Sequence, residues 1–338
     1  MQRLTVTWAL LSLALLACGG DDDDDDGSDG GTAADAAPQT PDAALEPDAA
    51  AADAAPTADC SPALPLDPGQ ATFTLTSGGI ERSYVLYVPK GYAGDAALPV
   101  VLDFHGSGSN PGQELLISEI AAAADANGFL VVAPVAVVPS AGGGFTWNVP
   151  VDPEAADDVL FTSDVIADVA TRACADLKRV YASGYSGGGR LASLLACTSS
   201  DKIAAVSTVG GIRFTEPCEQ ARPVPILAFH GTADAINPYE GGGPAYWGDS
   251  VEVALADWAE HLDCEGEAVE AEVSKNVDTL SFAECAGDSE LVLYRVTDGG
   301  HTWPGTAFPF PAKPFGTVTQ EISATDLQTQ FFARFSLP

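Results

Sequence analysis

Short apolar segments alternate with amphipathic helical patterns along most of the chain, and this alternation limits the available folds more than any other feature. Strand-like segments lie at 71–76, 82–88, 99–104, 130–134, 180–184, 204–209, 225–229 and 290–296. Helical patterns lie at 112–127, 157–175, 188–198, 250–262 and 323–335. From about residue 99 onward, this order predicts an α/β fold with a mostly parallel, doubly wound sheet and helices on both faces. The first two strands predict an antiparallel hairpin around Gly78-Gly79.

One junction between a strand and a helix has an unusual composition. The pentapeptide at 184–188, Gly-Tyr-Ser-Gly-Gly, fits G-x-S-x-G and separates the apolar segment 180–184 from the helical pattern 188–198. Small residues around Ser186 suit a tight, strained turn that exposes the serine hydroxyl. Ser186 is therefore a candidate nucleophile, and a turn that merely joins two elements is the alternative interpretation.

A serine hydroxyl needs a histidine base, and the chain has four histidines. His301 lies in a loop after the apolar segment 290–296, where its side chain can reach the edge of a sheet, so it is the candidate base. His105 and His230 each end an apolar strand and precede glycine, and we expect them to be structural. His261 falls on a helical pattern and is expected at the surface.

The base needs an acid to orient it, and two aspartates compete for this role. Asp234 follows the apolar segment 225–229 and lies between Ser186 and His301 in sequence, which is the order of an α/β-hydrolase. Asp298 is only three positions before His301 and suits a turn. We favour Asp234 because of this order along the chain. All three candidates then follow strand ends, where open α/β sheets bind ligands.

Ester chemistry also needs N–H donors for the developing oxyanion. The backbone N–H of Gly187, at the start of the helix, is one candidate. The other is expected in the turn His105-Gly-Ser-Gly108; we assign it to Ser107, with Gly106 and Gly108 as open alternatives.

Aromatic residues near these loops are candidates for substrate contact. Trp303 comes two residues after His301, Trp147 lies in a Gly-rich loop, and Tyr246-Trp247 follows a Gly-rich turn. They could form a wall for a phenolic acyl group or a sugar ring, with ordinary packing as the alternative.

Seven sequence segments together resemble the esterase family of polyhydroxybutyrate depolymerases and feruloyl esterases, over nearly all of 60–338. They are RSYVLYVP (82–89), DFHGSGSN (103–110), DDVLF (157–161), RVYASGYSGGG (179–189), HGTAD (230–234), PYEGG (238–242) and GGHTWPG (299–305). The resemblance implies an α/β-hydrolase in which Ser186 is the nucleophile, Asp234 the acid and His301 the base. At Gly187 the chain departs from the family, which more often has Asn or Ala there.

The resemblance implies a monomeric esterase that works through an acyl-enzyme, with no metal and no organic cofactor. We expect feruloyl or acetyl esters of plant polysaccharide first, and a hydroxyalkanoate polyester or its oligomers second, because the sequence shows no additional polymer-binding domain. A serine peptidase and a non-catalytic binding module at the cell surface are the alternatives from other classes.

The N-terminus predicts export and a lipid anchor. Residues 1–17 contain one basic residue and an apolar run too short to span a membrane, and Leu-Leu-Ala17-Cys18 matches a bacterial lipobox. We predict a signal peptide at 1–17, lipidation of Cys18, and a location in the cell envelope, at the outer membrane or cell surface. An ordinary secretion signal is the alternative.

Residues 18–59 are predicted to be a disordered tether before an esterase domain at 60–338. Residues 19–59 contain 13 acidic residues and no Lys or Arg, so they cannot form a core. The run Asp21 to Asp26 could hold Ca²⁺, but it lacks the loop spacing of such sites and is better interpreted as solvated. The net charge of −34 makes nucleic acid an improbable partner.

Six cysteines remain when Cys18 is set aside, and an even number in an exported chain suggests three disulfides. We predict Cys197–Cys218 and Cys264–Cys285, since each pair brackets one local excursion of the chain, which leaves Cys60–Cys174. Zinc binding is the weaker alternative, because there is no C-x-x-C pair and no nearby histidine with ligand spacing.

Overall fold

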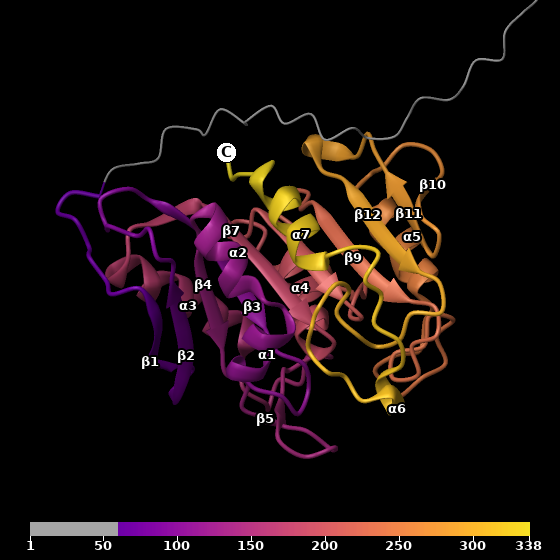
Figure 1. The fold of residues 1–338 in the computed structure, drawn as a ribbon, viewed down its shortest axis with the longest axis horizontal. Coiled ribbons are helices and arrows are strands. Elements are labelled where there is room, and N and C mark those ends of the chain that lie inside the picture. The colour runs from indigo at the N-terminus through magenta and orange to yellow at the C-terminus, as the bar shows by residue number, and fades with distance from the viewer. Residues whose placement is uncertain (1–59) are drawn as a thin grey trace, which may run out of the picture. The chain divides into compact units, whose positions relative to one another are not determined.

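The computed structural model describes residues 60–338, which form an α/β domain around a ten-stranded sheet (Figure 1). Its strands are β1 (Gly69–Ser77), β2 (Ile80–Val88), β3 (Leu98–Phe104), β4 (Leu130–Pro134), β7 (Ala175–Tyr185), β8 (Ala205–Val209), β9 (Ile226–Gly231), β10 (Val269–Ser274), β11 (Val277–Phe282) and β12 (Leu291–Val296). A separate two-stranded hairpin consists of β5 (Val138–Pro139) and β6 (Phe145–Thr146). The predicted signal peptide, Cys18 and the tether lie outside the described residues.

The strand order is β1-β2-β4-β3-β7-β8-β9-β12-β11-β10. The central run from β4 to β12 is joined by parallel pairings, and the strands at both ends pair antiparallel. The structure therefore confirms the mostly parallel sheet and the first hairpin. Gly78 and Gly79 form the hairpin turn with φ of 56° and 82°, the left-handed region that a two-residue turn of this kind requires.

Helices cover both faces of the sheet, as predicted. They are α1 (Pro111–Ile117), α2 (Ile120–Asn127), α3 (Asp158–Arg172), α4 (Gly187–Thr198), α5 (Val251–His261), α6 (Ala312–Phe315) and α7 (Ala324–Ala333). Apolar residues of α3, α4 and α5 form one core with alternate residues of the central strands. Apolar residues of α1, α2 and α7 form a second core. They pack with the intervening residues of the same strands, such as Val101 and Tyr181. None of the helices within 60–338 is both long and apolar enough to cross a membrane.

The single helix expected over 112–127 is wrong, because the chain breaks into α1 and α2 at Ser118 and Glu119. Glu119 has a left-handed backbone, with φ of 52°. The Ser118 carbonyl accepts a hydrogen bond from the Thr325 hydroxyl of α7, and the Ser118 hydroxyl donates to Asp103 of β3. Contacts with distant segments replace the helical hydrogen bonds here, so the local helical pattern could not reveal the break.

Strands β10 and β11 were absent from the sequence prediction. They extend the sheet beyond β12 as an antiparallel edge, and the side chains of β10 are mostly exposed. Their sequences, VEAEVS and VDTLSF, mix charged, small and apolar residues, because an edge strand does not need the continuous apolar run of a central strand.

All three predicted disulfides are present: Cys60–Cys174, Cys197–Cys218 and Cys264–Cys285. The first joins the start of the domain to the turn before β7. The other two close local loops, each with a sequence separation of 21. Three disulfides indicate that the protein folds in an oxidising compartment.

Candidate active site

Ser186 lies at the junction between β7 and α4, where the backbone turns sharply. Its φ of 54° and ψ of −111° are a strained combination for a residue with a side chain. The turn requires close packing of its neighbours: a Cβ added to Gly188 would lie 1.9 Å from the carbonyl oxygen of Phe104, on β3. The Ser186 N–H donates to the Val209 carbonyl at 2.8 Å, which ties the turn to the end of β8. The side chain is thereby presented at the carboxyl edge of the sheet.

The structure brings Asp234 and His301 together across the ends of β9 and β12. His301 Nδ1 lies 2.6 Å from Asp234 Oδ2, and both side chains are buried. The two strands pair in parallel, so the loops after them emerge at the same edge of the sheet. Ser186 and His301 line the same cavity, although the hydrogen bond from hydroxyl to imidazole is not formed among the described residues. Such bonds often tighten only when substrate binds.

Asp234 is held as a carboxylate by several donors. Its Oδ1 accepts hydrogen bonds from the backbone N–H groups of Ile236 and Asn237, both at 2.8 Å. Burial by itself would raise the pKa of Asp234, but hydrogen bonds from His230 and His301 outweigh it and hold this pKa well below its usual range. An acid that stays ionised beside the imidazole can orient it and stabilise its protonated form.

The remaining histidines and the rival acid have other positions. His230 stacks on Trp247, and its Nε2 lies 2.8 Å from the Asn237 carbonyl and 3.4 Å from Asp234 Oδ2. It therefore supports the acid, a contact that the sequence did not reveal. Asp298 is exposed in a turn, where its N–H donates to the Thr232 hydroxyl. His105 accepts from the Ala136 N–H within the core, which agrees with a structural role.

The backbone near Ser186 narrows the choice of oxyanion donors. The N–H of Gly108 donates to the Phe145 carbonyl at 2.8 Å, so it is already used. The N–H of Ser107 has no acceptor within residues 60–338, and its nitrogen lies 3.1 Å from the position that a Cβ of Gly187 would take. Gly187 begins α4, and the first N–H groups of a helix have no partner inside it. Ser107 and Gly187 thus present adjacent free donors.

A cavity of about 480 Å³ opens beside Ser186 and His301. One part of its wall is polar and belongs to Ser107, Ser109 and Gln113. The other part is aromatic and apolar. Phe308, Phe310 and Phe315 come from the segment before α7, and Ile117, Tyr185 and Tyr246 come from elsewhere in the chain. The phenylalanines were missed in the sequence, where the alternation Phe-Pro-Phe-Pro at 308–311 was the available signal.

The expected aromatic wall of tryptophans is wrong. Trp147 is 2% exposed and its indole N–H donates to the His105 carbonyl, while Trp303 is 1% exposed and donates to the Thr325 hydroxyl. Trp247 is also buried, under His230. All three indoles pack in the core and none lines the cavity; of the aromatics proposed from sequence, only Tyr246 does.

Two fully buried carboxyl groups lie behind the turn at 105–108, which carries the candidate oxyanion donor Ser107 and is called the oxyanion loop below. Asp103 is the penultimate residue of β3, and Glu114 lies in the first turn of α1. Burial raises the pKa of Asp103 to about 7. Burial and the neighbouring charge of Asp103 raise the pKa of Glu114 as well. At neutral pH the pair therefore holds at least one proton and does not add two charges beneath the site.

Comparisons with known proteins agree with this geometry. A family model described as Esterase PHB depolymerase matches residues 82–235, which include Ser186 and Asp234. Feruloyl esterase B of Piromyces equi is 32% identical over 233 residues, which are 65% of this chain and 42% of that protein. The chain thus spans less than half of that relative. "Putative esterase NocK" of Nocardia uniformis subsp. tsuyamanensis is 30% identical over 279 residues, 75% of this chain and 79% of that protein.

Solved structures share the fold. An acetyl xylan esterase from Aspergillus awamori superposes with a TM-score of 0.55 at 15% identity, over 78% of this chain and 98% of that chain. A thermostable esterase superposes with a TM-score of 0.53 at 18% identity, over 79% of this chain and 63% of that chain. Both are named as esterases, and at this identity the likeness concerns the fold alone, which here is the α/β-hydrolase fold.

Proposed function

Since this chain belongs to the family of polyhydroxybutyrate depolymerases and feruloyl esterases, we propose that it is a serine carboxylic-ester hydrolase that uses Ser186, Asp234 and His301. The observation that carries the proposal is the cavity that receives both Ser186 and the Asp234-bound imidazole of His301. Serine, histidine and a buried carboxylate in this order act as nucleophile, base and orienting acid.

The proposed reaction follows from the free atoms of the site. Because Nδ1 of His301 is bonded to Asp234, its Nε2 accepts the proton as the Ser186 hydroxyl attacks the ester carbonyl. The oxyanion receives hydrogen bonds from the N–H groups of Ser107 and Gly187. His301 then donates its proton to the departing alcohol, and water hydrolyses the acyl-enzyme by the same path.

The cavity wall supports a phenolic acyl group as the first substrate choice. Phe308, Phe310 and Phe315 offer apolar faces to an aromatic ring, and Gln113 and Ser109 offer hydrogen bonds to its hydroxyl group. A feruloyl ester of plant polysaccharide fits this description, and an acetyl ester would occupy less of the cavity. A hydroxyalkanoate polyester or its oligomers is the second choice, since its acyl chain is also apolar.

The proposal extends to the location of the protein. We place it in the cell envelope, attached through a lipid on Cys18, on the evidence of the lipobox sequence before that residue. The three disulfides are consistent with export.

The decisive experiment compares wild type with Ser186→Ala on p-nitrophenyl acetate. We expect kcat to fall by roughly 10³-fold or more, with an unchanged circular dichroism spectrum, because the variant has no nucleophile. Equal turnover by a folded variant would remove Ser186 from the mechanism. Rates on methyl ferulate, acetylated xylan and hydroxybutyrate oligomers then rank the substrates.

A further inference from the structure

A cavity of about 270 Å³ lies next to the catalytic cavity, and the two share Tyr246. Its wall includes two arginines, Arg190 and Arg213, together with Val149, Pro150, Phe214, Thr215, Glu216 and Ala245. Arginines are scarce in this acidic chain, which has 14 basic and 48 acidic residues. The presence of two arginines in the wall of one cavity, beside the proposed nucleophile, therefore needs a physical explanation.

Arg190 is a buried cation without a counter-ion. It is 6% exposed, and it makes no ion pair with any carboxylate in residues 60–338. Its guanidinium donates to the Val149 carbonyl at 3.0 Å and to the Ser107 hydroxyl at 3.2 Å, and it lies over the Tyr246 ring. Its Nε has no hydrogen-bond partner in the described part of the chain. Burying an unpaired charge is costly, so an anion bound here would relieve that cost.

Arg213 adds a like charge to the same wall. Burial, and to a lesser extent the charge of Arg213, lower the pKa of Arg190 to about 10, so Arg190 remains cationic at neutral pH. Two carboxylates are nearby and both are exposed to water: Glu216, which is also part of the wall, and Asp249, which pairs with Arg213 at 3.1 Å and is 61% exposed. Water screens these two carboxylates far more than it screens Arg190.

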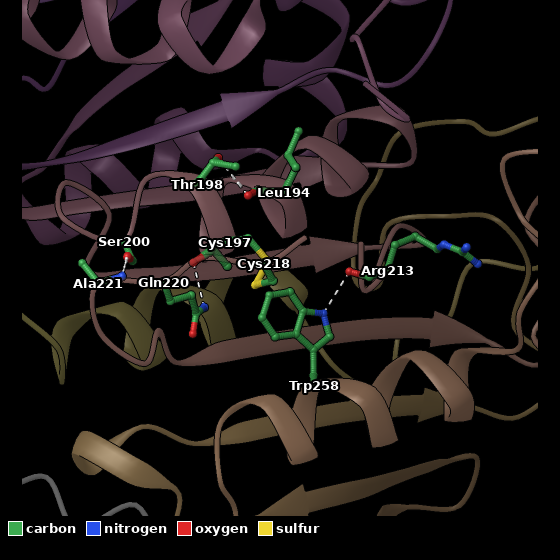
Figure 2. The surroundings of a disulfide bond; sticks show 10 residues. Leu194, Cys197, Thr198, Ser200, Arg213, Cys218, Gln220, Ala221 and Trp258 are labelled. Carbon is green, nitrogen blue, oxygen red and sulfur yellow. Dashed lines mark hydrogen bonds between the residues drawn. A yellow bond between two sulfur atoms is a disulfide. The ribbon is translucent and has the colours of Figure 1, made fainter. Parts of the chain in front are cut away.

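The backbone that carries Arg213 is connected to its neighbours by a nearby disulfide and by hydrogen bonds (Figure 2). The disulfide Cys197–Cys218 joins its loop to the end of α4, and the Trp258 indole N–H donates to the Arg213 carbonyl at 2.9 Å. The Arg213 N–H donates to the Ser193 hydroxyl. Figure 2 shows the Arg213 side chain extending away from the disulfide. This fixation lowers the entropy cost of binding a ligand at this position.

We propose that this second cavity, formed around Arg190, Arg213 and Tyr246, binds the alcohol half of the ester and selects an alcohol that carries a carboxylate. The inference rests on the proposed esterase function. An ester has two halves on opposite sides of its carbonyl, so an enzyme that uses the larger cavity for the acyl half needs a neighbouring space for the alcohol. A hydroxy acid and a uronic acid both supply such an alcohol, and they share the carboxylate that guanidinium groups bind.

The test uses pairs of substrates that differ only in charge. 3-Acetoxybutanoate and 3-acetoxybutanamide have the same acetyl ester and nearly the same shape. We expect wild-type kcat/KM to be about tenfold higher for the carboxylate, mainly through a lower KM, because charge-assisted hydrogen bonds form with one substrate only. Equal values, or a preference for the carboxamide, both in this pair and in the uronic-acid pair described below would overturn the proposal, since the acidic protein by itself repels anions.

Substitutions locate the effect. Arg213→Gln should reduce the carboxylate-to-carboxamide ratio of kcat/KM toward one, and Arg213→Lys should retain part of it. Lys202→Gln is the matched control, because it removes one positive charge from an exposed residue before β8, at the opposite edge of the sheet, and should leave the ratio unchanged. An unchanged ratio in a folded Arg213→Gln variant contradicts the assignment. If that variant does not fold, the proposal is tested on wild type alone. Its carboxylate-to-carboxamide ratio of kcat/KM should be high and should decline as salt is added.

The experiment also separates this subsite from the proposed function. Wild type that hydrolyses two matched pairs of substrates without preference in either pair defeats only the subsite, whereas no turnover of any of them or of p-nitrophenyl acetate defeats the esterase itself. O-acetylated methyl galacturonoside and its carboxamide form the second pair. A preference for the carboxylate in the first pair identifies a hydroxy acid as the alcohol, and one confined to the second pair identifies a uronic acid.

Discussion

Gly187 follows the proposed nucleophile at a point where a side chain would require Ser107 to move. A Cβ added there would lie 2.4 Å from the Ser107 hydroxyl oxygen and 3.4 Å from the Arg190 guanidinium. Ser107 and Arg190 occupy the space that a side chain at position 187 would take. Their positions therefore explain why glycine suits this position.

This contact predicts the behaviour of Gly187→Ala. The added methyl group should push the Ser107 loop away from Ser186 and lower kcat on p-nitrophenyl acetate by about tenfold or more, because the oxyanion donors lose their alignment. Ser107→Gly keeps the backbone N–H and removes the hydroxyl, so the double variant should recover much of the lost kcat. Additive losses in the two variants would contradict this explanation.

Residue-level reasoning identified three candidate side chains that the structure places near one another, but it did not identify the cavity wall. Ser186 was identifiable because its neighbours are small, and Asp234 and His301 because of their order along the chain. Trp147 and Trp303 had suitable positions in sequence, yet both indoles point into the core. Which way a loop side chain points depends on packing with distant segments, and one sequence does not contain that information.

At the scale of elements, β3 and α1 together support the oxyanion loop between them. Asp103 near the end of β3 and Glu114 in α1 are fully buried, and the Ser118 hydroxyl at the break after α1 donates to Asp103 at 2.8 Å. The raised pKa of Asp103, about 7, means that the folded protein prefers this carboxyl protonated.

This preference predicts how stability depends on pH. Between about pH 4, where Asp103 ionises in the unfolded chain, and about pH 7, the folded state holds one proton more, so stability falls as pH rises. In wild type the Asp103 carboxyl should lower the free energy of unfolding by about 1.4 kcal/mol for each pH unit in this range. Asp103→Asn should remove this contribution. Urea unfolding across this range measures it, with exposed Asp201→Asn as the control. Parallel curves for Asp103→Asn and wild type would show that Asp103 is ionised in the folded state.

For the whole molecule, the strongest remaining prediction concerns attachment to a membrane. In a bacterial host, Cys18→Ser should move the protein from the membrane fraction to the soluble fraction, because the acyl chains have no thiol to join. The kcat on p-nitrophenyl acetate should stay unchanged, since the catalytic domain at 60–338 is unaltered. Cell fractionation and incorporation of labelled palmitate provide the measurements. Membrane association that persists in Cys18→Ser would reject the anchor.

The sequence alone determined the sheet type, the hairpin, the three disulfide pairs and the candidate Ser186, Asp234 and His301. These features depend on local composition, on periodicity and on order along the chain, which a single sequence records. Only the tertiary structure decided the break at Ser118, the edge strands, the phenylalanine wall and the pairing of Arg190 with Ser107. Each of these depends on contacts between residues far apart in sequence, and their energies exist only once the chain has folded.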